Sequence, residues 1–308
     1  PPDDSTNQST SPTLQVTASD PNAADTNLTV RFYGRPVSTE GEDFTLVLIP
    51  DTQNMSQYYP SVFSSATAWI ASHKTSNNIV FVTHAGDVVN TSSSTTEYAN
   101  ADAAIDNLDA GSVWYSISTG NHDIAYGTTY YSNYFGVSRY SNYLYSNGFW
   151  FGGSYDDYNT YSLFSASGND FILINLQYNP STAVIAWADS LLTTYSNRRA
   201  IVEQHDLLNL NNTWNNQTSY NTLRSHANLF MMLCGHMHSS SDGAAYIAGT
   251  GTDGHTIHVV LADYQDYPNG GNGYLRFFRF SPANDMIYMT TYSPYIDASI
   301  TNTSNYDT

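Results

Sequence analysis

The sequence predicts an α/β fold built on a mixed sheet or on two packed sheets. From residue 43 onward, apolar runs rich in β-branched and aromatic residues alternate with longer stretches in which apolar residues recur every three or four positions. The last apolar runs follow one another without a helical stretch between them, which disfavours a purely parallel sheet. With 308 residues, 41% of them apolar, the chain can bury the core of one large domain or two small ones.

The elements are expected in the following order. Residues 1–42 are rich in Ser, Thr, Pro and Asp and contain two alternating stretches, 13–17 and 28–33, which predict a short β-rich N-terminal extension. The main domain is expected over residues 43–298, followed by a polar tail over 299–308. Its strands are predicted at 44–49, 79–82, 113–117, 171–176, 200–202, 229–233, 257–261, 274–280 and 286–290. Its helices are predicted at 57–73, 95–109, 181–195 and 217–227.

Two stretches of the main domain predict loops. Residues 127–161 are rich in tyrosine and glycine and show no clear period, so we expect a long irregular insertion that borders a functional cleft. Its tyrosines are expected to cover the sheet rather than to stack on a substrate. The residues Gly270-Gly271-Asn272-Gly273 predict a hairpin turn before the run at 274–280.

Composition restricts the partners. The formal charge is −18, and Lys74 is the sole lysine among nine basic residues, so a basic groove for duplex nucleic acid is not expected. Any phosphate must therefore be held locally, by metal ions or by a few arginines such as Arg139 or Arg198-Arg199. No apolar run is long enough to span a membrane, and one cysteine excludes an internal disulfide. The acidic, lysine-poor composition resembles that of secreted proteins, so a secreted or extracellular/periplasmic location is expected. The oligomeric state is not readable from the sequence.

Polar clusters stand where predicted strands end. In an α/β sheet the ligand site lies beyond the carboxyl ends of the strands, so clusters at these positions are expected to converge. Five of them follow apolar runs: Asp51-Thr52-Gln53, Gly86-Asp87-Val88-Val89-Asn90, Gly120-Asn121-His122-Asp123, His205-Asp206 and Gly235-His236-Met237-His238. A further triplet, Asp263-Tyr264-Gln265, also ends an apolar run and is expected at the cleft rim.

The side chains of these clusters suit a pair of metal ions. Carboxylates, imidazoles and an amide oxygen form a mixed set of nitrogen and oxygen ligands that fits Mn, Zn or Fe. Two such ions can share a bridging carboxylate and clamp the oxygens of a phosphoryl displacement, and they supply the positive field that an acidic protein lacks. For Asp51 and Asp87 the alternative is that each caps a following helix.

The ordered motifs Asp-x-Gln, Gly-Asp-x-x-Asn, Gly-Asn-His-Asp, His-Asp and Gly-His-x-His, spread over about residues 43–298, resemble the calcineurin-like metallophosphoesterase superfamily in an Asp-x-Gln variant of bacterial secreted type. The resemblance implies a four-layer sandwich of two mixed β-sheets flanked by helices, with a dinuclear metal site at the strand ends. The metal ligands that it implies are Asp51, Gln53, Asp87, Asn121, His205, His236 and His238.

The resemblance also implies specific roles for Asp87, His122 and Asp123. Asp87 would bridge the two ions. His122 would stabilise the developing charge or protonate the leaving oxygen, and Asp123 would orient its ring. The commonest pattern of the family has a histidine where this chain has Gln53, whose amide oxygen is a weaker ligand than imidazole.

Two alternative functions are consistent with these residues. The first is a metal-dependent phosphoesterase, either a phosphatase or a phosphodiesterase, that hydrolyses a small phosphate ester by direct attack of a dimetal-bound hydroxide. The alternative is a catalytically silent extracellular binding module that retains a structural metal site, which the departure at Gln53 suggests. The pair His122-Asp123 favours the enzyme, because holding a metal does not require it.

Overall fold

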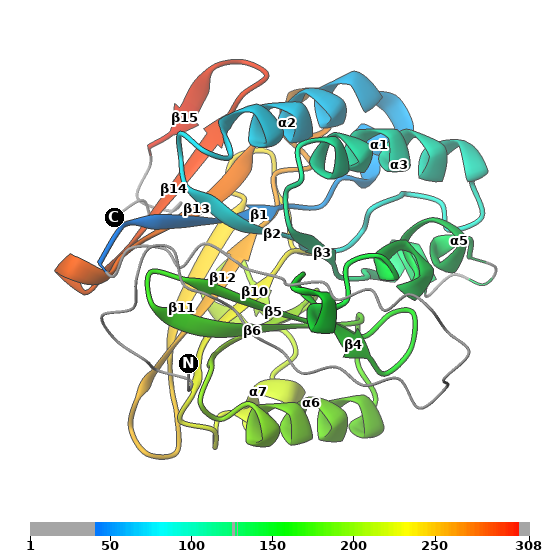
Figure 1. Cartoon of the computed structure of the whole chain (residues 1–308). Helices are drawn as coiled ribbons and strands as arrows, with labels where there is room; N and C mark the ends of the chain where they lie inside the picture. Colours follow the sequence, from blue (N-terminus) through cyan, green and yellow to red (C-terminus); the bar gives the residue numbers. More distant parts are fainter. Residues whose placement is uncertain (1–40, 125–126, 128, 302–308) are drawn as a thin grey trace, which may run out of the picture. The chain divides into compact units, whose positions relative to one another are not determined.

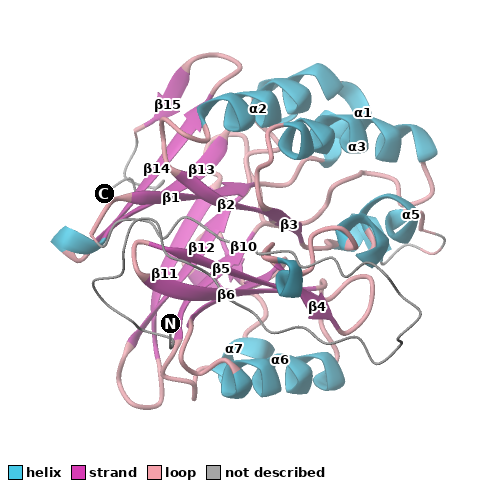
Figure 2. Cartoon of the chain, in the orientation of Figure 1, coloured by secondary structure: helices cyan, strands magenta, loops and turns pink. Residues whose placement is uncertain are grey.

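The computed structural model describes residues 41–124, 127 and 129–301. The strands predicted at 13–17 and 28–33, and nearly all of the predicted N-terminal extension, lie outside these residues. Within the described part, two mixed sheets stack face to face and helices cover both outer faces, so the chain forms the four layers expected (Figure 1). Figure 2 shows the same layers by type of secondary structure.

The first sheet has six strands. Its order is β15 (Ala298–Ile300), β14 (Met286–Ser293), β13 (Leu275–Ser281), β1 (Phe44–Ile49), β2 (Ile79–His84) and β3 (Tyr115–Ile117). β1, β2 and β3 run parallel, whereas β13 pairs with the other edge of β1 in antiparallel fashion. The sheet continues through β15 past residue 298, where the main domain was predicted to end.

The second sheet has seven strands. Its order is β11 (Ala244–Thr250), β12 (Thr256–Ala262), β10 (Leu229–Cys234), β7 (Arg199–Gln204), β6 (Asn169–Leu176), β5 (Thr160–Ala166) and β4 (Phe151–Ser154). The four strands β6, β7, β10 and β12 are parallel, and antiparallel strands lie at both edges. A small two-stranded ribbon of β8 (Leu208–Asn209) and β9 (Thr213–Trp214) pairs with neither of the two sheets.

Helices cover both outer faces of the sandwich. α1 (Gln53–Tyr58), α2 (Pro60–His73), α3 (Thr95–Ala110) and α5 (Tyr131–Phe135) pack on the first sheet, and α6 (Thr182–Thr194) and α7 (Thr218–Leu223) on the second. The helix predicted at 57–73 is two helices, because Pro60 lacks an amide hydrogen and begins a new helix. Ser94 caps α3 by accepting a hydrogen bond from Glu97 N, at 3.3 Å. None of the described helices combines the length and apolar character needed to cross a membrane.

The core lies in three layers that explain why the central strands read as unbroken apolar runs. In β1, Phe44, Leu46 and Leu48 face the second sheet, whereas Val47 and Ile49 face the helices. Both faces of this strand are therefore buried, and no polar alternation is possible. Burial on both faces also fixes the register of the strand, since a slip by one residue would exchange the two sets.

The tyrosine-rich stretch is more regular than expected. Besides α5 it contains two 3-10 helices, η1 (Val137–Tyr140) and η2 (Tyr145–Asn147), all of β4 and the start of β5. Tyr131 and Tyr140 are buried in the layer between the first sheet and its helices, so these aromatic rings cover the sheet as predicted. The Trp150 indole donates a hydrogen bond to Tyr115 O at 2.8 Å, which ties the segment to β3.

The hairpin predicted at 270–273 is wrong. β12 lies in the second sheet and β13 in the first, so these residues belong to a crossing between sheets. The crossing contains the short helix α8 (Pro268–Gly271), and the 3-10 helix η3 (Pro282–Asn284) forms the turn between β13 and β14.

Candidate metal centre

The predicted clusters follow parallel strands whose carboxyl ends meet at one edge of the sandwich. Asp51 follows β1, Asp87 follows β2 and α4 (Asn121–Ile124) follows β3 in the first sheet, while His205 follows β7 and His236 follows β10 in the second. Ligand atoms of Asp87, His205 and His236 all lie within 4.8 Å of one another. The convergence expected from the sequence is therefore confirmed for these three side chains.

Two motif glycines let the carboxylates lie directly against the backbone. A Cβ atom on Gly120 would stand 2.0 Å from Asp87 Oδ1, and one on Gly235 would stand 1.9 Å from Asp51 Oδ1. A side chain at either position would force the neighbouring carboxylate to move. The backbone is also strained at the centre, because Asp87 (φ 48°) and His236 (φ 71°) adopt the left-handed conformation that non-glycine residues avoid.

His205 is held so that one ring nitrogen is available to a ligand. Its Nδ1 donates to Ala85 O at 2.9 Å, which leaves the lone pair on Nε2. Nε2 lies 3.3 Å from Asp87 Oδ2 and 3.9 Å from Asp51 Oδ2. Burial alone would lower the pKa of His205, but the carboxylates of Asp87 and Asp51 outweigh it and raise the pKa well above its usual value. The two acids thus favour positive charge at Nε2, where a metal cation also fits.

The pKa values of Asp87 and Asp51 are shifted in opposite directions. Burial would raise the pKa of Asp87, yet His205 outweighs it and the pKa is lowered, so this carboxylate stays ionised. Its Oδ1 also accepts the amide hydrogen of His122, at 2.8 Å. The pKa of Asp51 is raised well above its usual range, mainly by burial and to a lesser extent by the charge of Asp263. Asp51 therefore needs a neighbouring positive charge to remain ionised.

The two histidines of the Gly-His-x-His motif occupy different places. The ring of His236 stands 5.0 Å from that of His205, and burial together with His205 lowers the pKa of His236 to about 4, which keeps the imidazole neutral and able to bind a metal. His236 N donates to Asp51 Oδ2 at 3.0 Å. The side chain of His238 is 38% exposed, and its Nδ1 lies 2.8 Å from Asp266 Oδ2. His238 is thus at the rim of the centre, and its predicted ligation stays a prediction.

The pair His122-Asp123 is arranged differently from the expectation. His122 Nδ1 lies 2.8 Å from Asn90 O, so the carbonyl of Asn90 orients the ring. The buried carboxylate of Asp123 accepts hydrogen bonds from the amides of Gly120 (2.9 Å), Val88 (3.0 Å) and Val89 (3.2 Å). In these contacts Asp123 joins the loops after β2 and β3, and thereby positions His122 indirectly.

Several buried polar atoms at the centre are suited to bind a metal ion. Asp51 Oδ1, Gln53 Oε1 and His205 Nε2 are buried and have no hydrogen-bond partner. Buried polar atoms without partners are costly, and all three are lone-pair donors of the kind that bind divalent metals. The donor set of the centre therefore fits a metal site. Asn121 is buried at the start of α4.

Other predicted residues have structural roles. Arg139, a candidate phosphate clamp, binds Asp102, Asp106 and Asp109, three carboxylates of α3. Arg198 donates to two backbone carbonyls of the second sheet, so neither of these arginines is a phosphate clamp at the centre. His84 supports the centre without joining it, because its Nε2 lies 2.9 Å from Thr52 Oγ1 and its Nδ1 accepts from Gly86 N at 3.1 Å.

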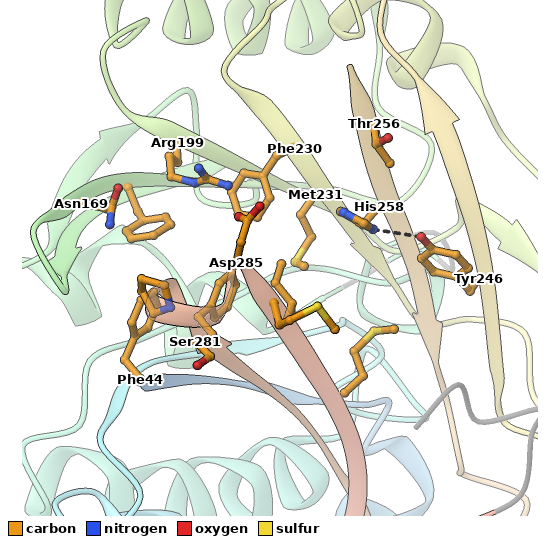
Figure 3. A pocket seen from close by; sticks show the side chains of 16 residues that line it. Phe44, Asn169, Arg199, Phe230, Met231, Tyr246, Thr256, His258, Ser281 and Asp285 are labelled. Atoms are coloured by element: carbon orange, nitrogen blue, oxygen red, sulfur yellow. Dashed lines mark hydrogen bonds between the residues drawn. The ribbon is translucent and has the colours of Figure 1, made fainter. Parts of the chain in front are cut away.

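A separate cavity of about 660 Å³ opens at the other end of the parallel strands, between the starts of β1, β6, β7 and β10. The Arg199 guanidinium stacks over the Phe230 ring at 4.5 Å, and Tyr246 Oη lies 2.9 Å from His258 Nδ1 (Figure 3). None of the predicted metal ligands lines this cavity, and neither His122 nor Asp123 does. It is therefore distinct from the candidate metal centre.

The two-sheet fold with a group of possible metal ligands at its strand ends agrees with the comparisons to known proteins. A sequence model of the calcineurin-like phosphoesterases matches residues 44–240, so the chain belongs to this family. It is 33% identical over 273 residues to the uncharacterized protein YvnB of Bacillus subtilis strain 168. That match covers 85% of this chain and 21% of the relative, so the chain spans about a fifth of the relative's length.

Two solved structures share the fold. A dimetal phosphatase from Danio rerio has a TM-score of 0.53 at 16% identity, over 84% of this chain and 98% of that one. The protein TT1561 of Thermus thermophilus has a TM-score of 0.51 at 9% identity, over 80% of this chain and 98% of that one. At these identities the likeness shows the fold alone.

Proposed function

We propose that this protein is a metal-dependent phosphoesterase that hydrolyses a small phosphate ester. The observation that carries the proposal is the cluster of the buried Asp87 and His205 with the half-buried His236, with Asp51 beside it, at the strand ends of a calcineurin-like fold. When metal ions are bound there, they supply Lewis-acid polarisation of the phosphate and an activated water at neutral pH.

The side chains of the centre would hold two ions in the manner that the family implies. Asp87 is the proposed bridge, with His205, His236 and Asn121 on one side and Asp51, Gln53 and His238 on the other. The ionised state of Asp87 and the neutral state of His236 suit these roles.

His122 is the proposed general acid. Its Nδ1 donates to Asn90 O, so Nε2 is the atom that can carry a proton to the leaving oxygen. Its backbone amide is bonded to Asp87 Oδ1, which fixes the ring's position relative to the proposed bridge. Asp123 is proposed as a positioning residue, since it holds the backbone of both neighbouring loops.

The charge of −18 favours a small substrate over a polyanion such as duplex nucleic acid. A location outside the cytoplasm, which the lysine-poor composition suggests, stays a prediction.

The test is elemental analysis of protein never exposed to chelator, together with hydrolysis of an aryl phosphate and of a bis-aryl phosphate. We expect close to two metals per chain and turnover that is lost on chelation and regained with Mn²⁺ or Zn²⁺. The preferred ester separates a phosphatase from a phosphodiesterase. Two bound metals with no turnover of either ester would favour the binding module, and full activity of metal-free protein would contradict the proposal.

A further inference from the structure

A second Asp-x-Gln triplet faces the first one across the sandwich. Asp263-Tyr264-Gln265 follows β12 of the second sheet just as Asp51-Thr52-Gln53 follows β1 of the first. Asp263 and Gln265 are both buried, with exposed fractions of 0% and 3%. The triplet is anchored by Tyr264, whose hydroxyl lies 2.9 Å from Thr291 Oγ1 in the first sheet.

The two triplets are in direct contact. The carboxyl group of Asp263 interacts with that of Asp51. The loops are also joined by Asn54 Nδ2, which donates to Gln265 O at 3.2 Å. The residues expected at the rim of a cleft therefore lie against the predicted metal ligand Asp51.

Each triplet presents two buried oxygens that receive no hydrogen bond from an N–H or O–H group of the described residues when both carboxyl groups are ionised. Asp51 Oδ1, Gln53 Oε1, Asp263 Oδ2 and Gln265 Oε1 are buried and have no hydrogen-bond partner. The other oxygen of Asp263 is used, because Oδ1 accepts the amide hydrogen of Gln265 at 3.0 Å. Two buried carboxylates side by side are costly unless a cation lies between them or a proton is shared.

We propose that Asp263 contributes a carboxylate oxygen to the metal subsite of Asp51 and, with the amides of Gln53 and Gln265, makes that subsite oxygen-rich and selective for Mn²⁺. This inference rests on the metal binding in the proposed function. It explains how the chain tolerates Gln53 in place of histidine, since a carboxylate from another strand compensates for the weaker amide ligand. Oxygen ligands suit Mn²⁺, whereas the subsite of His205 and His236 offers imidazoles, which also suit Zn²⁺.

The test measures Mn²⁺ binding to metal-stripped protein by calorimetry, and the Mn content after desalting. Wild type should bind two Mn²⁺. Asp263→Asn keeps the shape and the acceptor for Gln265 N, and should retain one Mn²⁺ tightly while the affinity for the other falls by about 10- to 100-fold. Asp285→Asn, at an exposed aspartate beside the opposite cavity, is the matched control and should behave as wild type. Adding Gln53→His to Asp263→Asn should restore the second ion with Zn²⁺ preferred.

Tight binding of two Mn²⁺ by Asp263→Asn would overturn the inference and indicate that Asp51 and Asp263 share a proton instead. If that variant fails to fold, Gln265→Met, which removes the side-chain amide at a similar side-chain length, tests the same subsite and should also weaken one Mn²⁺. The experiment distinguishes a failure of the proposed function from a failure of the inference about Asp263. Wild type that binds two Mn²⁺ and hydrolyses neither ester would refute the proposed function alone, whereas active wild type with an unaltered Asp263→Asn would refute the inference alone.

Discussion

At the scale of single residues, the centre is made by backbone geometry as much as by ligand side chains. Asp87 and His236 occupy strained left-handed conformations, and Gly120 and Gly235 leave room for two carboxylates. Backbone carbonyls, from Ala85 and Asn90, fix the tautomers of His205 and His122. The arrangement of the candidate ligands therefore depends on residues outside the cluster.

Replacement of His122 separates catalysis from metal binding. In His122→Asn we expect kcat to fall by about 10²- to 10⁴-fold, because the proposed general acid is lost, while the metal content stays that of wild type. Steady-state kinetics and elemental analysis on one preparation measure both quantities. His258→Asn, in the opposite cavity, is the control and should keep the rate of wild type. Unchanged turnover in His122→Asn would remove this residue from the mechanism.

Replacement of Gly235 tests the packing of Asp51. The new methyl group in Gly235→Ala would stand 1.9 Å from Asp51 Oδ1, so the carboxylate must move. We expect the variant to retain fewer than two metals per chain and to lose most activity. Elemental analysis after desalting measures the loss, and full retention of both metals would show that the loop adjusts without moving Asp51.

At the scale of elements, an acid links the two sheets beneath the centre. Glu203 of β7 is buried, and its carboxylate accepts hydrogen bonds from the hydroxyl of Thr83 on β2 and from Asn175 Nδ2 on β6. One carboxylate oxygen, Oε1, has no partner. Burial is the main cause that raises the pKa of Glu203 to about 8, so the side chain is protonated at neutral pH.

This acid makes stability depend on pH. In the unfolded chain Glu203 ionises near its ordinary pKa of 4.5, whereas in the folded chain it ionises near 8, so the folded state binds more protons between these values. The free energy of unfolding should therefore fall as pH rises from about 4.5 to 8, by on the order of a few kcal/mol. Urea unfolding of metal-stripped wild type and Glu203→Gln across this range measures the effect. The variant should give the flatter profile, and parallel profiles would contradict this assignment.

At the scale of the whole molecule, the centre joins the two sheets. Asp51 and Asp87 come from the first sheet and His205 and His236 from the second, so any ion held by all four ties the sandwich together at this edge. The opposite edge holds the cavity lined by Phe44 and Phe230.

Metal removal should therefore destabilise the whole domain. At free metal concentrations 100-fold above Kd, each site adds about 2.7 kcal/mol to the free energy of unfolding. For a domain of this size that corresponds to a rise in Tm of roughly 5–10 °C per site. Calorimetry before chelation, after chelation and after return of Mn²⁺ measures the change. A Tm that is independent of metal would mean that the ions do not bridge the sheets.

The sequence by itself determined the fold class, the positions of most central strands and the cluster of Asp87, His205 and His236. These followed because strands buried on both faces must be apolar throughout, and because functional groups collect where parallel strands end. The sequence also supplied the ordered motifs that place the chain in its family. It did not reveal β4, β11 or the break at Pro60 within the helix predicted at 57–73.

Only the tertiary structure decided which residues stand beside those that the motifs supply. The contact of Asp263 with Asp51 joins strands of different sheets, and no periodicity within one segment reports such a pairing. The carbonyl of Asn90, rather than Asp123, orients His122. The sequence could not predict this contact, because any residue has a backbone carbonyl and its position depends on the fold. The crossing at Gly270–Gly273 was predicted as a hairpin because local turn chemistry is the same whether the next strand joins the same sheet or the opposite one.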